Sequence, residues 1–245
     1  MPKAGTHLLT RLLELLHFRE VGTSLDIGPN EGLVTITPKL IQQASANLSQ
    51  IGPGCFARSH MYFYPEILRI INENQVKTVT IVRDPRDVCV SDAFHIAGRP
   101  DHRLHRYYAE MSEEERLMAS IVGMSSSQLG GDPPSSDIGF HYRHYLGWVK
   151  DGAGLLVKFE DLVGERGGGT DQAQMETVTK ISKYLELGLS KQKLIALCGN
   201  LFWTGARTFR KGQIGTWRQH FRPAHMTAFR HVVGTVMEDF RYGGE

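Results

Sequence analysis

A run of β-branched residues limits the possible folds of this chain more than any other feature. Residues 76–82 read VKTVTIV, are flanked by polar residues and lead into Asp84-Pro85. An apolar, β-branched run of this length is typical of a buried strand, and a proline just after it suits the first turn of a helix. We therefore predict a βα unit in which a strand of a parallel sheet leads into a helix.

Patterns elsewhere in the chain extend this unit into an α/β fold. From Thr6, the expected N-cap, leucines recur up to Leu16 with the spacing of one helix face. The other predicted elements are a strand at 155–159, a helix that begins at Pro65, and helices near 172–185 and 190–198. Strands that alternate with helices favour an open parallel sheet flanked by helices.

We expect a single domain that spans residues 1–245, because a chain of 245 residues with 41% hydrophobic content can bury one large core. The segment 123–139 is rich in Ser, Gly and Pro. Loops of more than about 12 residues inside a compact domain are often lids or binding segments, so we predict a mobile loop here. Residues 164–170 contain three consecutive glycines and are predicted to form a second loop.

Charge and cysteine content argue against several classes of protein. Lys and Arg number 28 against 26 Asp and Glu, so we predict neither a nucleic acid nor a membrane as partner. No apolar stretch reaches the roughly 18 residues of a membrane span, and Arg11 and Glu14 argue against a signal peptide. Cys55, Cys89 and Cys198 lack the spacing of zinc ligands. We expect buried thiols in a reducing compartment, which predicts a cytoplasmic protein.

The segment PKAGTH at 2–7 is a candidate phosphate-binding loop, which makes the predicted sheet P-loop-like. It places a lysine, a glycine turn and a hydroxyl at a helix start, where backbone N–H groups and the helix dipole favour a phosphate. Lys3 precedes Gly5, whereas a Walker A loop has its lysine after its glycines, so a P-loop kinase using Mg-ATP is disfavoured. Taken alone, the segment fits an ordinary helix start better.

The segment RDPRDVCVS starts at Arg83, at the carboxyl end of the predicted strand, and ends at Ser91 on the following helix. Ligands of open α/β sheets bind at such strand ends. We predict that Arg83 pairs with phosphate oxygens and that Ser91 donates one hydrogen bond. Asp84, Arg86 and Asp87 are expected to form surface ion pairs.

The segment FRKGQIGTWRQHF at 209–221 contains adjacent cations and two glycines, followed by aromatic residues. A flexible basic loop of this kind is suited to wrap a phosphate. The alternative for so short a basic pair is a solvated, charged turn.

Together, these three segments resemble the motifs of the PAPS-dependent sulfotransferase family of cytosolic type, which read PKSGTTW, RNPKDVAVS and RKGxxGDWKNHF. The order of the motifs is the same, and the resemblance spans residues 2–221. It implies that a sulfonate moves from 3′-phosphoadenosine 5′-phosphosulfate (PAPS) to an acceptor. Adenosine 3′,5′-bisphosphate (PAP) is then the product, and no metal takes part.

The resemblance also implies residue roles. The residues implied to hold the 5′-phosphosulfate are Lys3, Ala4, Gly5, Thr6 and His7. Those implied to hold the 3′-phosphate are Arg83, Ser91, Arg210, Lys211 and Gly212. KFEDL at 158–162 is similar to the family's YEDL segment, which assigns Phe159 to adenine without the tyrosine hydroxyl.

The catalytic base implied by the resemblance is His60, because RSHM at 58–61 is similar to the family's KTHLP segment. An unperturbed histidine pKa of about 6.5 allows the imidazole to accept the acceptor's proton near neutral pH. The implied reaction is in-line attack on sulfur, with Lys3 stabilising charge on the departing phosphate. Ser91 completes the set of implied catalytic residues.

Some residues depart from the family pattern. The family's phosphate loop follows a central strand, yet only Met1 precedes Pro2 here. Because a missing strand would leave its neighbours with exposed edges, we expect upstream residues in the natural protein. Leu8 and Thr216 stand where the family has tryptophan and aspartate. The alternative function is a catalytically inactive or truncated nucleotide-binding protein of the same fold.

The acceptor is expected to be a small molecule with an alcohol, phenol or amine group, because no long basic groove for a polysaccharide is evident. The candidate pocket residues, about half of which we expect to be core residues, are Met61, Tyr62, Phe63, Phe94, His95, Tyr142, His144, Tyr145 and Trp148. The family's C-terminal dimer motif is only partly matched at 234–239, so the oligomeric state stays open.

Overall fold

The computed structural model describes residues 1–22, 36–150, 153–205 and 211–242. Their short parallel strands and many helices confirm the α/β class. The described residues fall into two compact units. The first unit contains residues 1–22, 36–83, 147–150, 153–205 and 211–214, and the second contains residues 84–146 and 215–242. The extent of a single domain stays a prediction, and each unit is described by itself.

The first unit contains two pairs of parallel strands. β3 (Val79–Val82) lies beside β4 (Leu155–Lys158), with Val79 opposite Leu155 and Val82 opposite Lys158. β1 (Arg19–Glu20) and β2 (Cys55–Phe56) form the second pair. Both longer strands were predicted, although β3 begins three residues later than expected and β4 ends one residue earlier. Because β3 and β4 are parallel and in register, their carboxyl ends meet at one edge.

The described residues of the first unit contain the four helices predicted from sequence and three that were not predicted. They are α1 (Thr6–Leu15), α2 (Pro38–Leu48), α3 (Pro65–Glu73), α8 (Gly147–Lys150), α9 (Phe159–Leu162), α10 (Asp171–Tyr184) and α11 (Lys191–Leu201), with a 3₁₀ turn at Glu165–Gly167. The three that were not predicted are α2, α8 and α9. Thr170 caps α10 by accepting a hydrogen bond from the Ala173 amide, and Ser190 caps α11 in the same way. The predicted helices at Pro65, 172–185 and 190–198 are therefore confirmed.

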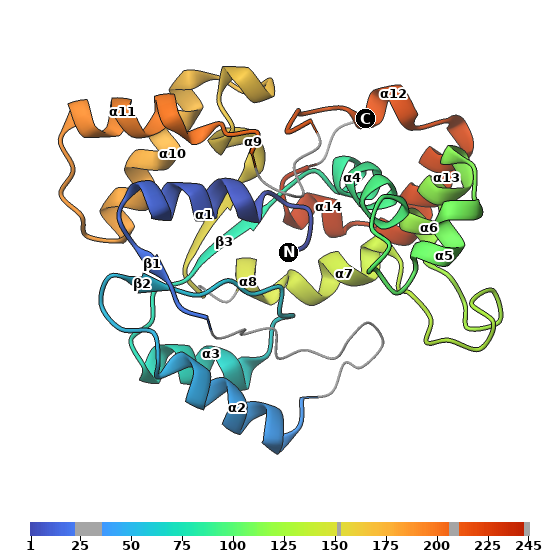
Figure 1. Cartoon of the computed structure of the whole chain (residues 1–245), viewed down its shortest axis with the longest axis horizontal. Coiled ribbons are helices and arrows are strands. Elements are labelled where there is room, and N and C mark those ends of the chain that lie inside the picture. Colours follow the sequence, from blue (N-terminus) through green and yellow to red (C-terminus); the bar gives the residue numbers. More distant parts are fainter. Residues whose placement is uncertain (23–35, 151–152, 206–210, 243–245) are drawn as a thin grey trace. The chain divides into compact units, whose positions relative to one another are not determined.

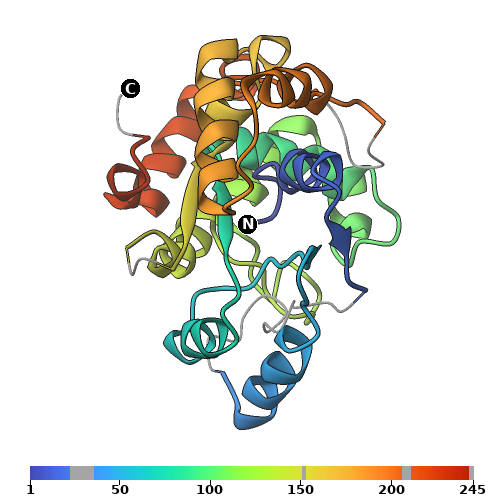
Figure 2. The same cartoon turned by 90° about the vertical axis from the view of Figure 1, so that its left-hand side faces the viewer.

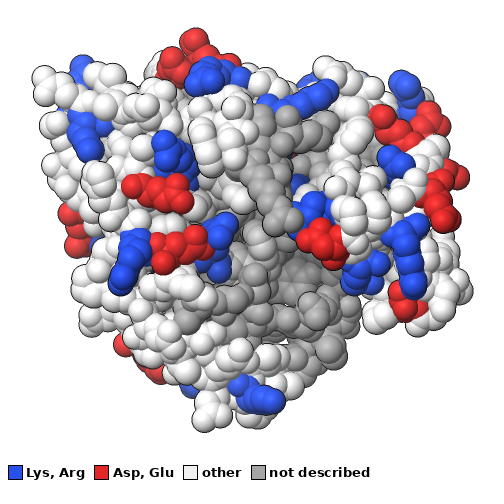
Figure 3. All heavy atoms as spheres, viewed as in Figure 1, with Lys and Arg blue, Asp and Glu red and all other residues white. Residues whose placement is uncertain are grey.

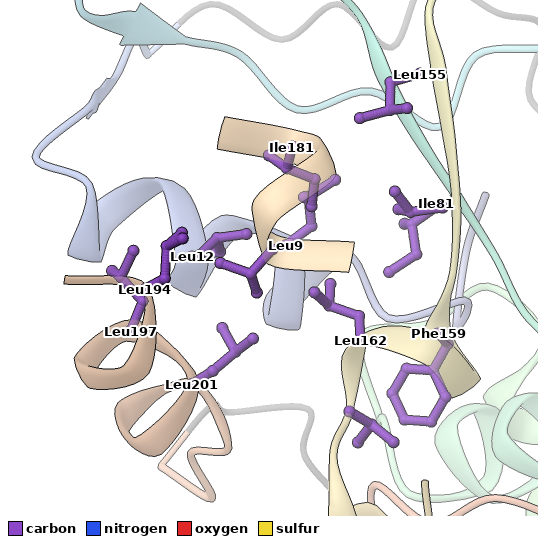
Figure 4. Packing of buried hydrophobic residues seen from close by; sticks show 13 residues of the cluster. Leu9, Leu12, Ile81, Leu155, Phe159, Leu162, Ile181, Leu194, Leu197 and Leu201 are labelled. Atoms are coloured by element: carbon purple, nitrogen blue, oxygen red, sulfur yellow. The ribbon is translucent and has the colours of Figure 1, made fainter. Parts of the chain in front are cut away.

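An apolar cluster joins α1, α9, α10 and α11 to β3 and β4. Leu12, Leu162, Ile181 and Leu201 are fully buried in it. Figure 4 shows the leucines of α1 directed toward Ile181 of α10 and the leucines of α11, and Figure 1 shows these helices side by side. Figure 2 shows α10 running along the two strands. Each buried leucine contributes about 1.5–3 kcal/mol, so the cluster holds α1 firmly against the sheet.

The second unit is built from helices around α4. They are α4 (Pro85–Ala97), α5 (His105–Glu110), α6 (Glu113–Val122), α7 (Ile138–Tyr145), α12 (Trp217–His220), α13 (Pro223–Val233) and α14 (Val236–Asp239). α4 packs against α5, α6, α7 and α12, and α13 packs against α6 and α7. The helix predicted to follow the strand at 79–82 is thus present as α4.

The segment at 123–139 is mostly irregular, but α7 already begins at Ile138, so the loop is shorter than predicted. Leu129 is fully buried in the loop, and its carbonyl accepts a hydrogen bond from the Tyr107 hydroxyl at 2.6 Å. Arg103 donates to the carbonyls of Pro133 and Pro134. These bonds attach the segment to α5 and the turn before it, and the mobility of the segment stays a prediction.

The structure tests two expectations drawn from composition, namely that the cysteines are buried and that charge is balanced over the surface. All three cysteines are free thiols, but only Cys89 is buried, while Cys55 and Cys198 are half-buried. The expectation of three buried thiols was wrong, because strand β2 and helix α11 each leave one side partly open to solvent. Figure 3 shows basic and acidic side chains interspersed over the described residues of one face. No helix in the described part of the chain is long and apolar enough to cross a membrane.

Candidate functional site

The carboxyl ends of β3 and β4 bring together two of the predicted ligand-binding residues. Arg83 follows Val82 and Phe159 follows Lys158, which are opposite each other in the sheet. The guanidinium carbon of Arg83 lies 4.3 Å from the centroid of the Phe159 ring, close enough for a cation–π contact. Their exposed fractions are only 7% for Arg83 and 4% for Phe159. This edge is where open α/β sheets bind their ligands.

The N-terminal loop reaches the same edge through Gly5. A Cβ atom at Gly5 would lie 2.6 Å from Cδ2 of Phe159 and 3.2 Å from Cδ1 of Ile81, so only glycine fits without displacement. Gly5 also has φ 104°, a left-handed conformation that favours glycine. It is the N-cap of α1, whereas Thr6 is the first helical residue. The prediction of Thr6 as N-cap was wrong, because the left-handed turn places the helix start one residue earlier.

The start of α1 has the properties of an anion site. The first N–H groups of a helix have no partner within the helix, and no side chain caps those of α1. Lys3 (φ 57°) and Gly5 are both left-handed, a backbone form found in anion-binding concavities. The first turn of α1 contains no acidic residue. Ala4 is fully buried, while Lys3 and Thr6 are half-buried, so the loop is anchored but accessible.

His7 lies in the first turn of α1, next to positive charge. Loss of water around the ring lowers its pKa from the usual 6.5, and the charges of Arg58 and Lys3 lower it further. The side chain as a whole is exposed. His7 is therefore mostly neutral at pH 7, and its ring has both a donor and an acceptor nitrogen.

The late basic segment contacts the same sheet edge. Nη2 of Arg83 donates a 2.7 Å hydrogen bond to the carbonyl of Gln213. Lys211 is exposed, and Gly212 is half-buried with φ 60°. Lys211 and Gly212 therefore come just before Gln213, whose carbonyl accepts the hydrogen bond from Arg83. Arg210 lies outside the described residues.

A glycine-rich turn at 164–169 supports the late segment, which sequence reasoning did not anticipate. The Ile214 amide donates to the Gly167 carbonyl at 2.9 Å, and the Gln213 side chain donates to the Arg166 carbonyl at 2.7 Å. A Cβ atom at Gly167 would lie 2.8 Å from the Gly212 carbonyl oxygen. The three consecutive glycines were the available signal, because they permit this close backbone approach.

His60 lies in the irregular stretch between β2 and α3, and its side chain is exposed. Its neighbours are anchored. The Met61 amide donates to Oγ of Ser59 at 3.0 Å, and Nε1 of Trp148 donates to the Met61 carbonyl at 3.1 Å. The backbone around His60 is thus held in place, and its role as the base stays a prediction.

In the second unit, the residues that follow Arg83 are buried rather than at the surface. Asp84 caps α4 by accepting from the Arg86 amide at 2.9 Å, and it forms a 2.7 Å ion pair with the Arg86 guanidinium. Asp87 is fully buried. The expected ion pair is present between Asp84 and Arg86, but the expected surface location was wrong for all three residues. Ser91 is half-buried and lies four residues beyond Asp87, on the same face of α4.

The carboxylate of Asp87 binds the start of α12. It accepts hydrogen bonds from the Gly215 amide (2.7 Å), the Thr216 hydroxyl (2.9 Å) and the Trp217 amide (2.9 Å). The guanidinium carbon of Arg86 lies 4.1 Å from the centroid of the Trp217 ring. The beginnings of α4 and α12 are therefore joined by several buried polar contacts.

A family model described as a sulfotransferase domain matches residues 1–241, nearly the whole chain. The chain belongs to the sulfotransferase-domain family. This result confirms the family that the three sequence motifs indicated.

Individual relatives of this sulfotransferase are distant. It is 23% identical to Sulfotransferase 6B1 of Danio rerio over 242 residues, which cover 91% of this chain and 71% of that protein. It is 26% identical to Sulfotransferase 2A1 of Rattus norvegicus over 178 residues, which cover 69% of this chain and 60% of that protein. The chain therefore spans roughly two thirds of the length of these relatives.

Solved structures share the fold of this sulfotransferase. Mouse sulfotransferase SULT7A1 complexed with PAP has a TM-score of 0.61 and 16% identity, covering 98% of this chain and 81% of that chain. Retinol dehydratase in complex with retinol and PAP has a TM-score of 0.61 and 17% identity, covering 100% of this chain and 81% of that chain. A retinol dehydratase complex with androsterone and inactive cofactor PAP has a TM-score of 0.59 and 18% identity, covering 97% and 79%. At these identities the likeness shows the fold alone.

The candidate acceptor residues of this sulfotransferase divide by burial. The buried ones are Met61, Tyr62, Tyr142, Tyr145 and Trp148, and the half-buried ones are Phe63, Phe94, His95 and His144. The rings of Trp148 and Phe63 pack at right angles to each other, with their centroids 5.2 Å apart. Among the described residues, no group of three or more His, Cys, Asp or Glu side chains is placed to hold a metal ion.

Proposed function

We propose that this sulfotransferase transfers a sulfonate from PAPS to a hydroxyl or amine of a small-molecule acceptor and releases PAP. The observation that carries the proposal is the start of α1, where uncapped N–H groups and Lys3 lie beside the edge that holds Arg83. An anionic co-substrate suits this arrangement, because the helix dipole and two cations favour negative charge. Solved structures of the same fold hold PAP, and those of retinol dehydratase also hold retinol or androsterone, which are small molecules.

The proposed roles divide the donor into two halves. Lys3, Ala4, Gly5, Thr6 and His7 hold the 5′-phosphosulfate, and Arg83, Ser91, Arg210, Lys211 and Gly212 hold the 3′-phosphate. Phe159 is proposed to contact adenine. Its ring already supports Arg83 and packs against Gly5, so the residue also links the two halves.

The proposed reaction is an in-line displacement at sulfur. An acceptor oxygen or nitrogen forms a bond to sulfur while the bond between sulfur and the bridging 5′-phosphate oxygen breaks. His60 takes the acceptor's proton, and the departing phosphate keeps the electron pair of the broken bond. Lys3 and the N–H groups of α1 stabilise the growing phosphate charge, and Ser91 orients the donor through its 3′-phosphate. Removing one such electrostatic group typically lowers the rate by about 10² to 10³.

Donor binding is the first test. Calorimetric titration with PAP is expected to give micromolar affinity, with no comparable binding of ATP. Arg83→Ala is expected to abolish most of the PAP affinity, because it removes a cation buried at the site. Equal binding of PAP and ATP, or none of PAP, would contradict the proposal.

Turnover is the second test. Transfer from radiolabelled PAPS is measured with a panel of simple phenols, aliphatic alcohols and amines. We expect at least one acceptor to be sulfonated and His60→Gln to lose at least about 10² of the rate while PAP affinity is kept. PAP binding without transfer to any acceptor would favour the alternative, an inactive nucleotide-binding protein of this fold.

We also propose that the protein acts in the cytoplasm without a nucleic-acid or membrane partner. Its three free thiols support a reducing compartment, and the near balance of 28 basic and 26 acidic residues supports the absence of such partners. Fractionation of cells that make the tagged protein tests the location. Recovery in a membrane or secreted fraction would contradict it.

A further inference from the structure

The most deeply buried carboxylate near the proposed donor site is not itself assigned to the donor. Asp87 has no exposed surface, and its oxygens accept hydrogen bonds from the Gly215 amide, the Thr216 hydroxyl and the Trp217 amide. An ionised carboxylate is costly to bury unless several donors surround it. The loss of Asp87 would leave the buried Thr216 hydroxyl and two partly buried amides without this acceptor.

The segment that Asp87 holds directly follows the basic loop. Lys211 and Gly212 are proposed to contact the 3′-phosphate, and Gly215 comes three residues after Gly212. The residues between them are held by Arg83 and by the Gly167 carbonyl. From Gly215 onward, the backbone is held by two hydrogen bonds, which the Gly215 and Trp217 amides donate to Asp87. The Trp217 side chain is held by its contact with the Arg86 guanidinium.

Asp87 also belongs to the helix face that carries Ser91. Residues four positions apart lie on the same side of a helix, so the bonds of Asp87 fix the beginning of the face on which Ser91 lies. A carboxylate would repel a phosphate, and the oxygens of Asp87 already accept hydrogen bonds from Gly215, Thr216 and Trp217. Its contribution to donor binding is therefore indirect.

We infer that Asp87 is a positioning residue for the 3′-phosphate half of the donor site. By tying residues 215–217 to the beginning of α4, it fixes the helix face on which Ser91 lies. The inference rests on the proposed function, because it assumes that PAP is the ligand. It predicts a defect restricted to ligands that carry a 3′-phosphate.

Thr216 contributes one of these hydrogen bonds through its side chain. The family motif has aspartate at this position, whereas the Thr216 hydroxyl here donates to Oδ1 of Asp87 at 2.9 Å. Thr216→Val keeps the shape and removes one of the three hydrogen bonds. Thr216→Asp introduces a second carboxylate beside Asp87, where like charges repel. The expected order of PAP affinity is wild type, then Thr216→Val, then Asp87→Asn.

The experiment compares PAP with adenosine 5′-phosphate, which lacks the 3′-phosphate. Asp87→Asn keeps one acceptor oxygen and turns an N–H₂ group toward the donors, so about a 10- to 100-fold loss of PAP affinity is expected. The affinity for adenosine 5′-phosphate is expected to stay within about threefold, because α1 and its loop are held by the separate apolar cluster. Calorimetry measures the first affinity, and ligand-observed NMR titration measures the second.

Asp137→Asn is the matched control. Asp137 is another carboxylate of the second unit that accepts a backbone hydrogen bond, from the Phe140 amide at 2.7 Å, and its other partner is Arg143 rather than residues 215–217. This variant is expected to keep both affinities. Thermal unfolding of every variant shows whether a general loss of stability accompanies the change in affinity.

The possible outcomes are distinct. A loss of PAP affinity alone in Asp87→Asn, with a smaller loss in Thr216→Val, supports the inference. Unchanged PAP affinity, or equal losses for both ligands, overturns it. If Asp87→Asn does not fold, Thr216→Val decides the question with the same comparison. Absence of PAP binding in the wild type overturns the proposed function itself, and this inference with it.

Discussion

Replacing Gly5 with alanine tests whether the N-terminal loop is positioned by its contact with Phe159. A Cβ at this residue would lie 2.6 Å from Cδ2 of Phe159, well inside ordinary carbon–carbon contact. The left-handed backbone costs an alanine about 1–2 kcal/mol, and overpacking of a dense core typically adds about 1–3 kcal/mol. We therefore expect Gly5→Ala to lower the free energy of unfolding by about 2–5 kcal/mol, or roughly 4–20 °C in Tm.

The measurement is urea and thermal unfolding, with Gly188→Ala as the control. Gly188 is also left-handed (φ 57°), but a Cβ there would meet nothing within 4 Å, so only the backbone term of about 1–2 kcal/mol remains. A double variant, Gly5→Ala with Phe159→Ala, is expected to be less unstable than the sum of the single variants, because the contact is relieved. Equal destabilisation by Gly5→Ala and Gly188→Ala would refute the argument.

Three further predictions follow from single side chains. Arg83→Lys should weaken PAP binding at least about tenfold, because lysine lacks the planar fork that contacts Gln213 and Phe159 together; unchanged calorimetric affinity would contradict this. The pKa of His7 is lower in the folded protein than in the unfolded chain. As the pH falls below about 6.5, His7 of the unfolded chain is therefore protonated first, and the free energy of unfolding decreases until the pH reaches the pKa of His7 in the folded protein. His7→Gln should flatten this part of the curve of unfolding free energy against pH. Burial raises the pKa of Cys89 well above normal, so mapping of alkylated peptides should find this thiol modified last, after the half-buried Cys55 and Cys198.

Local sequence patterns predicted most of the elements that form the sheet edge. The β-branched run gave β3 within three residues, and the leucine spacing gave α1 with an error of one residue at its cap. These predictions succeed because such signals depend on neighbouring residues alone. Gly5 was expected to form a turn, but its contact with Phe159 involves a residue more than 150 positions away and has no local signal.

The polar interior of the second unit was missed for the same reason. Asp84, Arg86 and Asp87 form a charged, alternating stretch that is typical of solvated surfaces, yet all three are buried. The partners of Asp87 lie 128 to 130 residues away in the chain. A sequence reveals the charge of such residues but not the donors that make their burial favourable, so their structural role required the fold.

The two halves of the proposed donor site are supported by different forces, and this difference determines how substitutions should act. The loop at Lys3 to Gly5 depends on apolar burial of α1, where Leu12→Ala would cost about 2–5 kcal/mol through the transfer and cavity terms. That cost falls on the stability of the whole unit. Residues 215–217 and the face of α4 that carries Ser91 depend on hydrogen bonds to one carboxylate, and removal of that acceptor acts first on the short segment it holds. Core substitutions should therefore lower Tm with little change in ligand preference. Substitutions around Asp87 should instead change the preference for a 3′-phosphate by more than their effect on Tm explains.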